Sequence, residues 1–577
     1  MMIEGRLRAS PADLARAWAE QDPDLETRAE LLALVEAGNE AELSERMHAP
    51  LEFGTAGLRG VVGAGLARMN RAVVIRATRG LADTLLKKVP DSRSLPVVVG
   101  YDGRLSSREF AEVTVAVLVA AGIPVRVFDE PVPTPIVAFA AKELSAQAAI
   151  VITASHNPPE YNGYKVYAPN AAQIVPPWDR EIAEAIERVE RADRVPLAEA
   201  AFDRAERVPA SLIERYLDEI DAVRPTGRFD RDFPIVYTAM HGVGAKLLTR
   251  AFARAGYARL QLVAEQSEPD GTFPTVRFPN PEEPGALDLA LALAKAEGAE
   301  LILANDPDAD RLAVCVATAT GRMVQLSGNQ IGVLLADLML SQALRAPRPL
   351  VASSIVSSPM LGDIARAHGA RFEQTLTGFK WIWNAALDLE RDEHLRFCFG
   401  YEEALGYSVG RIVRDKDGIS AALLFADLAA RCRAEGTTIL EHLHRLYVRH
   451  GLWVSVQKSV TLPGAQGAAR IAAAMQRLGS APPSEVDGFA VSEVVDFREG
   501  GEARPRWLPN TELIALMLGP RGRVLVRPSG TEPKLKIYVD LRAEVDAPER
   551  ISELESATLE LAQSLAGGVA NSLGLAD

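Results

Sequence analysis

The sequence predicts an α/β protein of three similar mixed α/β domains followed by a C-terminal α+β domain. At 577 residues the chain is too long for one hydrophobic core. An alternation of strand and helix patterns occurs three times between residues 96 and 399, and each round ends in a polar cluster. The spacing is too irregular for a stacked solenoid. After about Trp453 the order changes to strands with a closing helix, which is typical of an α+β domain.

The elements of the first half follow from apolar periodicity and from end signals. The first fifty residues are helical in pattern, and Ser10 and Pro11 form a helix start. In the first round we expect strands at residues 97–101, 125–128 and 148–153. Ser106 and Glu109 predict a capping box at the start of the first helix of this round. The second round has strands at residues 235–238, 260–263 and 301–304, with helices at 246–255 and 286–297.

The same signals predict the elements of the second half. The third round has strands beginning at residue 350, near residue 372 and at 395–399, with helices at 360–368 and 381–389. The last domain has strands at residues 454–460, 523–526 and 535–541 and a helix at 551–566. We place the domains at residues 1–225, 226–335, 336–452 and 453–577.

Composition and charge exclude several classes of function. A net charge of -14 argues against nucleic acid or an anionic membrane as a partner, so an anionic small molecule would need a local basic pocket. The longest uncharged apolar run, residues 113–125, is too short to span a bilayer. The N-terminal residues include Glu4, Arg6 and Arg8 with no apolar segment behind them, so we expect no secretory signal. Three cysteines without metal-ligand spacing fit a reducing cytoplasm.

The sequence TASHNP, residues 153–158, ends a predicted buried strand. In open α/β sheets ligands bind beyond the carboxyl ends of the strands. The Ser155 hydroxyl, followed at once by the His156 imidazole, is therefore well placed for chemistry. The alternative is an ordinary surface turn, since Ser, Asn and Pro are common turn residues.

The sequence DPDADR, residues 306–311, follows another predicted strand. Asp306, Asp308 and Asp310 can converge three hard oxygen ligands on one small cation, and Mg2+ is the expected ion. An EF-hand is excluded, because Arg311 and Ala317 stand where that loop requires Gly and Glu. The alternative is a solvated acidic turn, although three close carboxylates repel one another without a cation.

Two further loops have the composition of phosphate-binding sites. The sequence RPSGTEPK, residues 527–534, combines Arg527, Ser529 and Thr531 with backbone N–H groups between two strands. The glycine-rich sequence FGTAGLRG, residues 53–60, allows close backbone approach and includes Arg59. The alternative for the first of these is a common loop composition without a ligand.

Three weaker motifs lie between these loops. GYEEALG, residues 400–406, places Glu402 and Glu403 after an apolar strand, where a carboxylate can bind sugar hydroxyls or form an exposed acidic turn. Lys416 lies between two aspartates, either as a proton donor and acceptor or as part of a surface charge cluster. The sequence TLTGFK, residues 375–380, is similarly ambiguous.

Taken together and in this order, these motifs resemble those of the α-D-phosphohexomutase family, which includes phosphoglucomutases and phosphomannomutases. The resemblance covers the chain from about Phe53 to Tyr538, and TASHNP and DPDADR are its most specific parts. GYEEALGYS, with TGFKW before it, is similar to the branch of long bacterial phosphoglucomutases and phosphopentomutases. The family implies a four-domain, heart-shaped enzyme around a central cleft.

The resemblance also implies roles for individual residues. Ser155 would carry a phosphoryl group, and Mg2+ would be bound by the seryl phosphate with Asp306, Asp308 and Asp310. Arg59 and Arg311 would stabilise the transferring group, and His156 and Lys416 are candidates for acid–base work. The residues implied in substrate binding are Gly378, Lys380, Glu402, Arg527, Ser529, Gly530 and Thr531.

The predicted function is a phosphosugar mutase that interconverts glucose 1-phosphate and glucose 6-phosphate through a sugar 1,6-bisphosphate. Mannose and pentose phosphates are alternatives, because Ala404 stands where many family members have Ser. A haloacid-dehalogenase-type phosphatase or mutase would use Asp306 as nucleophile, but Asp310 occupies its Thr or Val position. A non-catalytic sugar-phosphate-binding protein is the remaining alternative. We expect a phosphosugar as the partner, and a monomer or a dimer.

Overall fold

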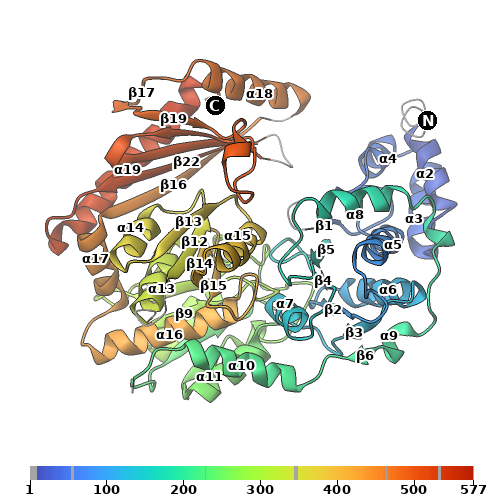
Figure 1. The fold of residues 1–577 in the computed structure, drawn as a ribbon, viewed down its shortest axis with the longest axis horizontal. Helices are drawn as coiled ribbons and strands as arrows, with labels where there is room; N and C mark the ends of the chain where they lie inside the picture. Colours follow the sequence, from blue (N-terminus) through green and yellow to red (C-terminus); the bar gives the residue numbers. More distant parts are fainter. Residues whose placement is uncertain are drawn as a thin grey trace. The chain divides into compact units, whose positions relative to one another are not determined.

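The computed structural model describes residues 10–52, 57–227, 229–342, 348–462, 464–529 and 534–575 (Figure 1). The chain divides into two compact units. Unit 1 comprises Met1–Thr226, Arg231–Gln325 and Gly406–Ala426, and unit 2 comprises Gly227–Asp230, Leu326–Leu405 and Asp427–Asp577. Among the described helices, not one has the length and the apolar character that a bilayer crossing requires.

The first sheet of unit 1 has six strands in the order β1-β5-β4-β2-β3-β6. Its strands are β1 (Leu58–Val61), β2 (Val97–Tyr101), β3 (Val125–Val127), β4 (Ala148–Ile152), β5 (Tyr161–Tyr167) and β6 (Glu206–Arg207). Strands β2, β3, β4 and β6 are parallel, whereas β5 is antiparallel to both β4 and β1. Both β2 and β4 are buried along their whole length. The helices α6 (Ser107–Ala120) and α7 (Thr134–Glu143) pack on these two strands.

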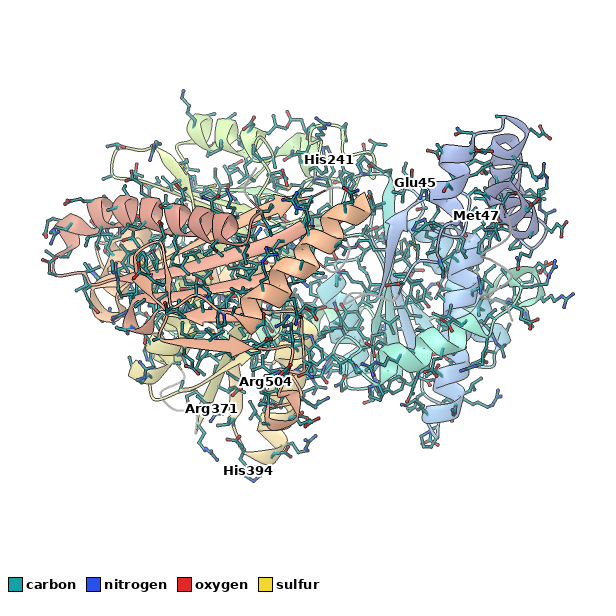
Figure 2. The ribbon with its side chains drawn as sticks, turned by 90° about the horizontal axis from the view of Figure 1, so that it is seen from above. Glu45, Met47, His241, Arg371, His394 and Arg504 are labelled. Carbon is teal, nitrogen blue, oxygen red and sulfur yellow. The ribbon has the colours of Figure 1, made fainter. Side chains whose placement is uncertain are left out.

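Three N-terminal helices belong to the same core as this sheet. They are α2 (Pro11–Ala19), α3 (Leu25–Glu36) and α4 (Glu40–Met47), and they share a hydrophobic cluster with α5 (Arg71–Lys88). Met47, labelled on α4 in Figure 2, is 4% exposed, and Trp18 and Leu31 are equally buried. The Ser10 hydroxyl caps α2 by accepting from the Asp13 N–H, so the predicted helix start is confirmed. The other helices here are α8 (Trp178–Glu187), α9 (Ala201–Arg204) and α10 (Ser211–Val223).

The second sheet of unit 1 has the order β11-β10-β9-β7-β8. Its strands are β7 (Ile235–Thr238), β8 (Leu260–Leu262), β9 (Leu301–Ala304), β10 (Ala313–Ala317) and β11 (Met323–Gln325). Strand β7 is parallel to β8 and β9, while β10 is antiparallel to β9. The helices α11 (Ala245–Ala255) and α12 (Asp288–Glu297) contact this sheet. The short strand β15 (Gly406–Val409) also belongs to unit 1 but is not part of this sheet.

Unit 2 contains a parallel sheet and an antiparallel sheet. The parallel strands β12 (Pro349–Ser354), β13 (Arg371–Thr375) and β14 (Arg396–Glu402) lie in the order β13-β12-β14. The antiparallel order is β16-β22-β21-β20-β19, formed by β16 (Leu452–Thr461), β22 (Lys534–Ala543), β21 (Gly522–Pro528), β20 (Ile514–Met517) and β19 (Glu493–Asp496). A small hairpin is formed by β17 (Glu485–Val486) and β18 (Phe489–Ala490).

The helices of unit 2 pack on these sheets. Those of the first sheet are α13 (Gly328–Gln342), α14 (Met360–Ala367) and α15 (Phe379–Asp392), and α17 (Ile439–His450) contacts α14. The antiparallel sheet carries α18 (Gly464–Ser480) and α19 (Ile551–Ser572), shown in orange and red in Figure 1. The remaining helix, α16 (Gly418–Ala434), begins in unit 1 and ends in unit 2. Three mixed α/β regions and one antiparallel α+β region confirm the predicted fold class.

The structure differs from the predicted elements in three places. Ser106 makes no side-chain capping bond for α6, and its hydroxyl accepts from the Asn162 amide at 2.9 Å. Residues 161–167 form β5, a strand that the apolar pattern does not predict. The strand predicted at residues 395–399 is longer in the structure, since β14 extends through Glu402, so that Glu402 is the last residue of the strand itself.

Candidate active site

The Asp306, Asp308 and Asp310 carboxylates form one buried cluster, the triad. The triad follows β9, which ends at Ala304, and each of the three residues is at most 1% exposed. One ligand oxygen from each residue lies within 4.8 Å of the other two. A solvated acidic turn is therefore the wrong interpretation of this sequence.

Two lysines and a hydroxyl compensate the triad. The Lys165 ammonium lies 2.8 Å from Asp308 Oδ2 and 3.1 Å from Asp310 Oδ2. Lys416 Nζ lies 3.1 Å from the same Asp310 oxygen. The Thr134 hydroxyl donates to Asp308 Oδ2 at 2.7 Å, and the Thr134 N–H donates to the Asp308 carbonyl at 3.0 Å. The triad is thus held by partners from β5, α7 and the loop before α16.

The three carboxyl groups of the triad differ in acidity. Burial, and next the negative charges of Asp308 and Asp310, raise the pKa of Asp306 well above its usual value. Burial also disfavours the charged form of Asp308, but the ammonium of Lys165 outweighs it and lowers the pKa of Asp308. The pKa of Asp310 is lowered as well, against its own burial and the charge of Asp308, because Lys165 and Lys416 face it. Asp306 therefore holds its negative charge least easily.

The triad has the donor set of a magnesium site. Asp308 Oδ1 and Asp310 Oδ1 are buried and make no hydrogen bond, although their partner oxygens do. An unpaired buried carboxylate oxygen is costly unless a cation or a donor faces it. Hard oxygen ligands from carboxylates are those that Mg2+ prefers. The residues present therefore fit the ion that the sequence predicts.

Ser155 lies against this triad. It follows β4 and is 3% exposed, so it does not lie in a surface turn. Its hydroxyl donates to Asp306 Oδ2 at 2.7 Å, and its N–H donates to the Thr153 hydroxyl at 2.8 Å. The backbone at Ser155 has a φ of 52°, in the left-handed region that few non-glycine residues adopt. Such strain concentrates at functional sites.

His156 lies beside the Ser155 hydroxyl, and the charges of two arginines act on its imidazole. His156 Nδ1 is 3.3 Å from Ser155 Oγ. Burial, followed by the positive charges of Arg311 and Arg59, lowers the pKa of His156 well below its usual value, so the imidazole is neutral at pH 7. A neutral imidazole can accept a proton. It cannot serve as a resident cation.

Arg59 and Arg311 supply the positive charge near Ser155. Arg59 Nη1 donates to Asn157 Oδ1 at 3.2 Å, within the Ser155 loop. Arg311 Nε lies 3.9 Å from Asp306 Oδ2 and 4.0 Å from Asp310 Oδ1. Guanidinium groups in this position suit the spread charge of a transferring phosphoryl group. Of the FGTAGLRG sequence, residues 53–56 lie outside the described residues.

Lys416 lies on a braced loop in unit 1. Its side chain is only 14% exposed, so a surface charge cluster is the wrong interpretation. The preceding carboxylate, Asp415, accepts from the Tyr167 hydroxyl at 2.5 Å and from the Gln173 amide at 2.8 Å. The following one, Asp417, accepts from the Tyr216 hydroxyl at 2.9 Å. These hydrogen bonds to Asp415 and Asp417 hold the loop in place, so that the Lys416 side chain is directed toward Asp310.

The predicted substrate-binding residues lie in unit 2. Glu402 is 9% exposed, which contradicts an exposed acidic turn, and its Oε1 accepts from the Gly378 N–H at 2.5 Å. Arg527 Nη1 donates to the hydroxyl of Thr377, the residue before Gly378, at 3.0 Å. The structure therefore joins Glu402, Gly378 and Arg527 around one loop.

Other predicted residues of unit 2 differ in position. Lys380, 5% exposed, lies in the first turn of α15. Ser529 donates its N–H to the Lys534 carbonyl at 2.7 Å, at the base of the β21–β22 hairpin. Gly530 and Thr531 lie outside the described residues. Glu403, unlike Glu402, is bound by the hydroxyls of Ser354 and Ser357 at 3.0 and 3.2 Å.

Sequence reasoning missed Lys165 and Thr134. Lys165 is a buried charged residue within the strand β5, and a charged residue in a buried strand is a signal for an ion pair. Thr134 stands between two prolines at the start of α7, which by itself indicates only a helix start. Both are joined to the triad across more than 140 residues of sequence, so no local pattern could reveal the contacts.

Comparisons with known proteins agree with this geometry. The four domain profiles of the phosphoglucomutase/phosphomannomutase family match in order: alpha/beta/alpha domains I, II and III at residues 50–193, 214–321 and 327–449, and the C-terminal domain at 495–558. The chain is 39% identical over 495 residues to the "Probable phosphomannomutase" of Haemophilus influenzae, covering 84% of this chain and 96% of that protein.

Two further proteins are similar over most of the chain. The phosphopentomutase of Mus musculus is 36% identical over 557 residues, covering 91% of this chain and 89% of that protein. The solved structure of a phosphoglucomutase/phosphomannomutase family protein from Burkholderia thailandensis has a TM-score of 0.66 at 22% identity, and the match covers 90% of this chain and 97% of that one. This structural likeness supports the fold.

Proposed function

This chain belongs to the phosphoglucomutase/phosphomannomutase family, and from that premise we propose that it interconverts glucose 1-phosphate and glucose 6-phosphate. The protein is a phosphosugar mutase, an isomerase. The observation that carries the mechanism is the Ser155 hydroxyl hydrogen-bonded to Asp306 within the buried triad. This places an oxygen nucleophile where a cation can neutralise a phosphate.

We propose that Ser155 is carried as a phosphoserine. The sugar hydroxyl attacks the seryl phosphorus, the bond from phosphorus to Ser155 Oγ breaks, and a sugar 1,6-bisphosphate forms. The bisphosphate then reorients, and Ser155 Oγ takes the other phosphoryl group, so that the phosphoenzyme is restored. Mg2+, held by the triad and the seryl phosphate, would supply charge neutralisation.

The proton of the attacking hydroxyl needs an acceptor. His156 suits this role because its imidazole is neutral and lies beside Ser155 Oγ. Lys416, whose ammonium is held at the triad, is the candidate for the opposite step, in which it donates a proton to the oxygen that loses its phosphoryl group. Arg59 and Arg311 would stabilise the charge that spreads over the equatorial phosphoryl oxygens.

The residues of unit 2 are proposed to bind the rest of the substrate. Glu402 would orient the sugar through its hydroxyls, together with Gly378 and Lys380. Arg527, Ser529, Gly530 and Thr531 would bind the phosphate that is not reacting. The support is the contact between Arg527 and Thr377, which brings a guanidinium to the loop that holds Glu402.

A pentose phosphate is the second candidate substrate. The mouse phosphopentomutase matches this chain over 557 residues, and Ala404 provides no hydroxyl in the sugar loop. Mannose phosphate is the third, on the similarity to the Haemophilus influenzae protein. We place the enzyme in the cytoplasm, where its three free, buried thiols fit a reducing compartment.

The experiment measures kcat/KM with Mg2+ and the matching sugar bisphosphate for glucose, mannose and ribose 1-phosphates. The proposal expects the highest kcat/KM for glucose 1-phosphate, and a preference for ribose 1-phosphate would replace it with the second candidate. Ser155→Ala should retain the fold and lose turnover by at least ~1000-fold. Substantial activity in Ser155→Ala would contradict the phosphoserine mechanism. Loss of the phosphoryl label in hydroxylamine would indicate an acyl phosphate and favour Asp306 as nucleophile.

A further inference from the structure

Arg104 clamps the backbone of the loop that carries Ser155. Its guanidinium donates four hydrogen bonds, all to carbonyl oxygens of one short segment, residues 155–161. The acceptors and distances are Ser155 O at 2.8 Å, Asn157 O at 2.5 Å, Pro158 O at 2.7 Å and Tyr161 O at 2.9 Å. Arg104 is 4% exposed, and neither the motifs nor the proposed chemistry gives it a role.

The segment depends on an outside partner for its shape. Ser155 has a left-handed backbone conformation, which is unfavourable for a non-glycine residue. Pro158 and Pro159 have no N–H, so they cannot contribute donors to a regular turn. The segment itself supplies one hydrogen bond, from the Tyr161 N–H to the Pro158 carbonyl at 3.1 Å. The Arg104 guanidinium pairs with the Ser155 and Asn157 carbonyls, and it shares the Pro158 carbonyl with the Tyr161 N–H.

Arg104 is itself held rigidly. Its Nε lies 3.4 Å from Asp102 Oδ2, and the ring of Phe273 lies 5.1 Å from the guanidinium carbon. Asp102 Oδ1 accepts from the Arg104 N–H at 3.0 Å and from the Ser107 hydroxyl at 2.6 Å. The Asp102 N–H donates to the Ile152 carbonyl of β4 at 3.0 Å. The clamp is therefore anchored to the strand that leads to Ser155.

We propose that Arg104 is a positioning residue that sets the place of Ser155 Oγ through the backbone of residues 155–161. An arginine has five N–H groups, and four of those of Arg104 go to carbonyls while the fifth, on Nε, faces Asp102. Arg104 consequently has no donor left for a phosphate, which separates it from Arg59 and Arg311. The inference rests on the proposed role of Ser155 as phosphoryl carrier.

The test compares Arg104→Ala and Arg104→Lys with a matched control, Arg68→Ala. Arg68 is a buried arginine of the same unit, 9% exposed, and it donates to Glu45 Oε1 at 2.8 Å and to the Ala67 carbonyl at 3.4 Å, neither of which belongs to residues 155–161. Misplacing a reacting group by about 1 Å can cost about 100-fold in rate. We therefore expect kcat of Arg104→Ala to fall about 100-fold with KM within about 3-fold, and Arg68→Ala to match the wild type once the folded fraction is equal.

Two further measurements separate positioning from stability. Guanidinium, at a concentration that leaves the protein folded, should raise the kcat of Arg104→Ala about fivefold or more. The small cation can occupy the space that the Arg104 side chain leaves and donate to the same carbonyls. Hydrogen exchange should quicken in residues 155–161 of Arg104→Ala and stay unchanged there in Arg68→Ala. Arg104→Lys should remain far below the wild type, since one ammonium cannot reach four carbonyls.

Each outcome decides the proposal. Equal losses in Arg104→Ala and Arg68→Ala, or a rise in KM at unchanged kcat, would overturn it, as would unaltered exchange in residues 155–161. Intact-mass detection of the phosphoserine in the wild type, after incubation with glucose 1,6-bisphosphate, keeps the two hypotheses apart. If the wild type takes up no phosphoryl group on Ser155, the proposed function fails, whereas a failure confined to the Arg104 variants concerns the clamp alone.

Discussion

Two buried carboxylate clusters of this molecule differ in how their oxygens are paired. In unit 1 the triad collects three aspartates, and its cationic partners are Lys165, Lys416 and, at 3.9 Å from Asp306, Arg311. In unit 2 a single aspartate, Asp337, is hydrogen-bonded to His368 Nε2 at 3.0 Å, and His442 Nε2 lies 3.4 Å from its other carboxylate oxygen.

The difference teaches how a functional charge cluster can be told from a structural one. The triad retains two buried oxygens, on Asp308 and Asp310, that make no hydrogen bond, so it can accept a further cation. Both oxygens of Asp337 face a histidine, so that cluster has its partners already. Buried carboxylate oxygens without a hydrogen bond indicate a binding site, whereas a carboxylate whose two oxygens both face a partner stabilises the fold.

Asp308→Asn and Asp337→Asn should separate the two clusters most clearly. Asp308→Asn removes one triad charge, and we expect turnover to fall about 1000-fold, as when an electrostatic partner of the transition state is lost. Asp337→Asn should keep turnover within about threefold, because Asp337 and its two histidines all lie in unit 2, whereas the triad lies in unit 1. Steady-state assays over a range of Mg2+ concentrations, with calorimetric titration of Mg2+, measure both. Comparable losses of turnover in the two variants would refute the distinction.

Lys165→Met should have the next largest effect, and this effect is on the stability of the folded protein. Removing one partner of a buried ion pair leaves the other charges uncompensated, which costs about 3 kcal/mol. Because the triad of the variant carries more net negative charge, added Mg2+ should raise the melting temperature of Lys165→Met more than that of the wild type. Thermal unfolding with Mg2+ and with EDTA measures this. A stability loss that Mg2+ leaves unchanged would contradict the role of Lys165 as a charge partner of the triad.

The parts of the site that local sequence could predict are those carried by one loop. Ser155, the triad and Glu402 each stand at the end of a recognisable strand, and short motifs contain their chemistry. The three α/β regions follow from apolar runs that are buried on both faces of the sheet. For these features the local pattern and the tertiary structure agree.

The parts that sequence could not predict depend on distant contacts. Lys165 reaches the triad only because β5 pairs antiparallel to β4, a register that no local pattern specifies. The predicted capping box does not form for the same reason, since the side-chain amide of Asn162, 56 residues away, donates a hydrogen bond to the Ser106 hydroxyl. The Arg104 clamp likewise joins the loop after β2 to the loop after β4.

The acid stability of the Asp337 cluster gives the smallest and most specific prediction. Burial disfavours the carboxylate of Asp337, but the hydrogen bonds from His442 and His368 outweigh it and lower the pKa of Asp337 to about 2 from an ordinary 3.8. A carboxyl group whose pKa is lower in the folded protein stabilises the fold fully above its unfolded pKa and loses that contribution as pH falls through its folded pKa.

Asp337 should therefore contribute about 2 kcal/mol above pH 4, and the contribution should disappear between about pH 4 and pH 2. The free energy of unfolding in urea, measured from pH 6 to pH 3 for the wild type and Asp337→Asn, tests this. The two curves should converge as pH falls below 4, while the Mg2+ dependence of turnover at pH 7 stays the same in both proteins. A stability difference that is constant across this pH range would show that Asp337 acts through packing, and the comparison with the triad would then no longer rest on charge.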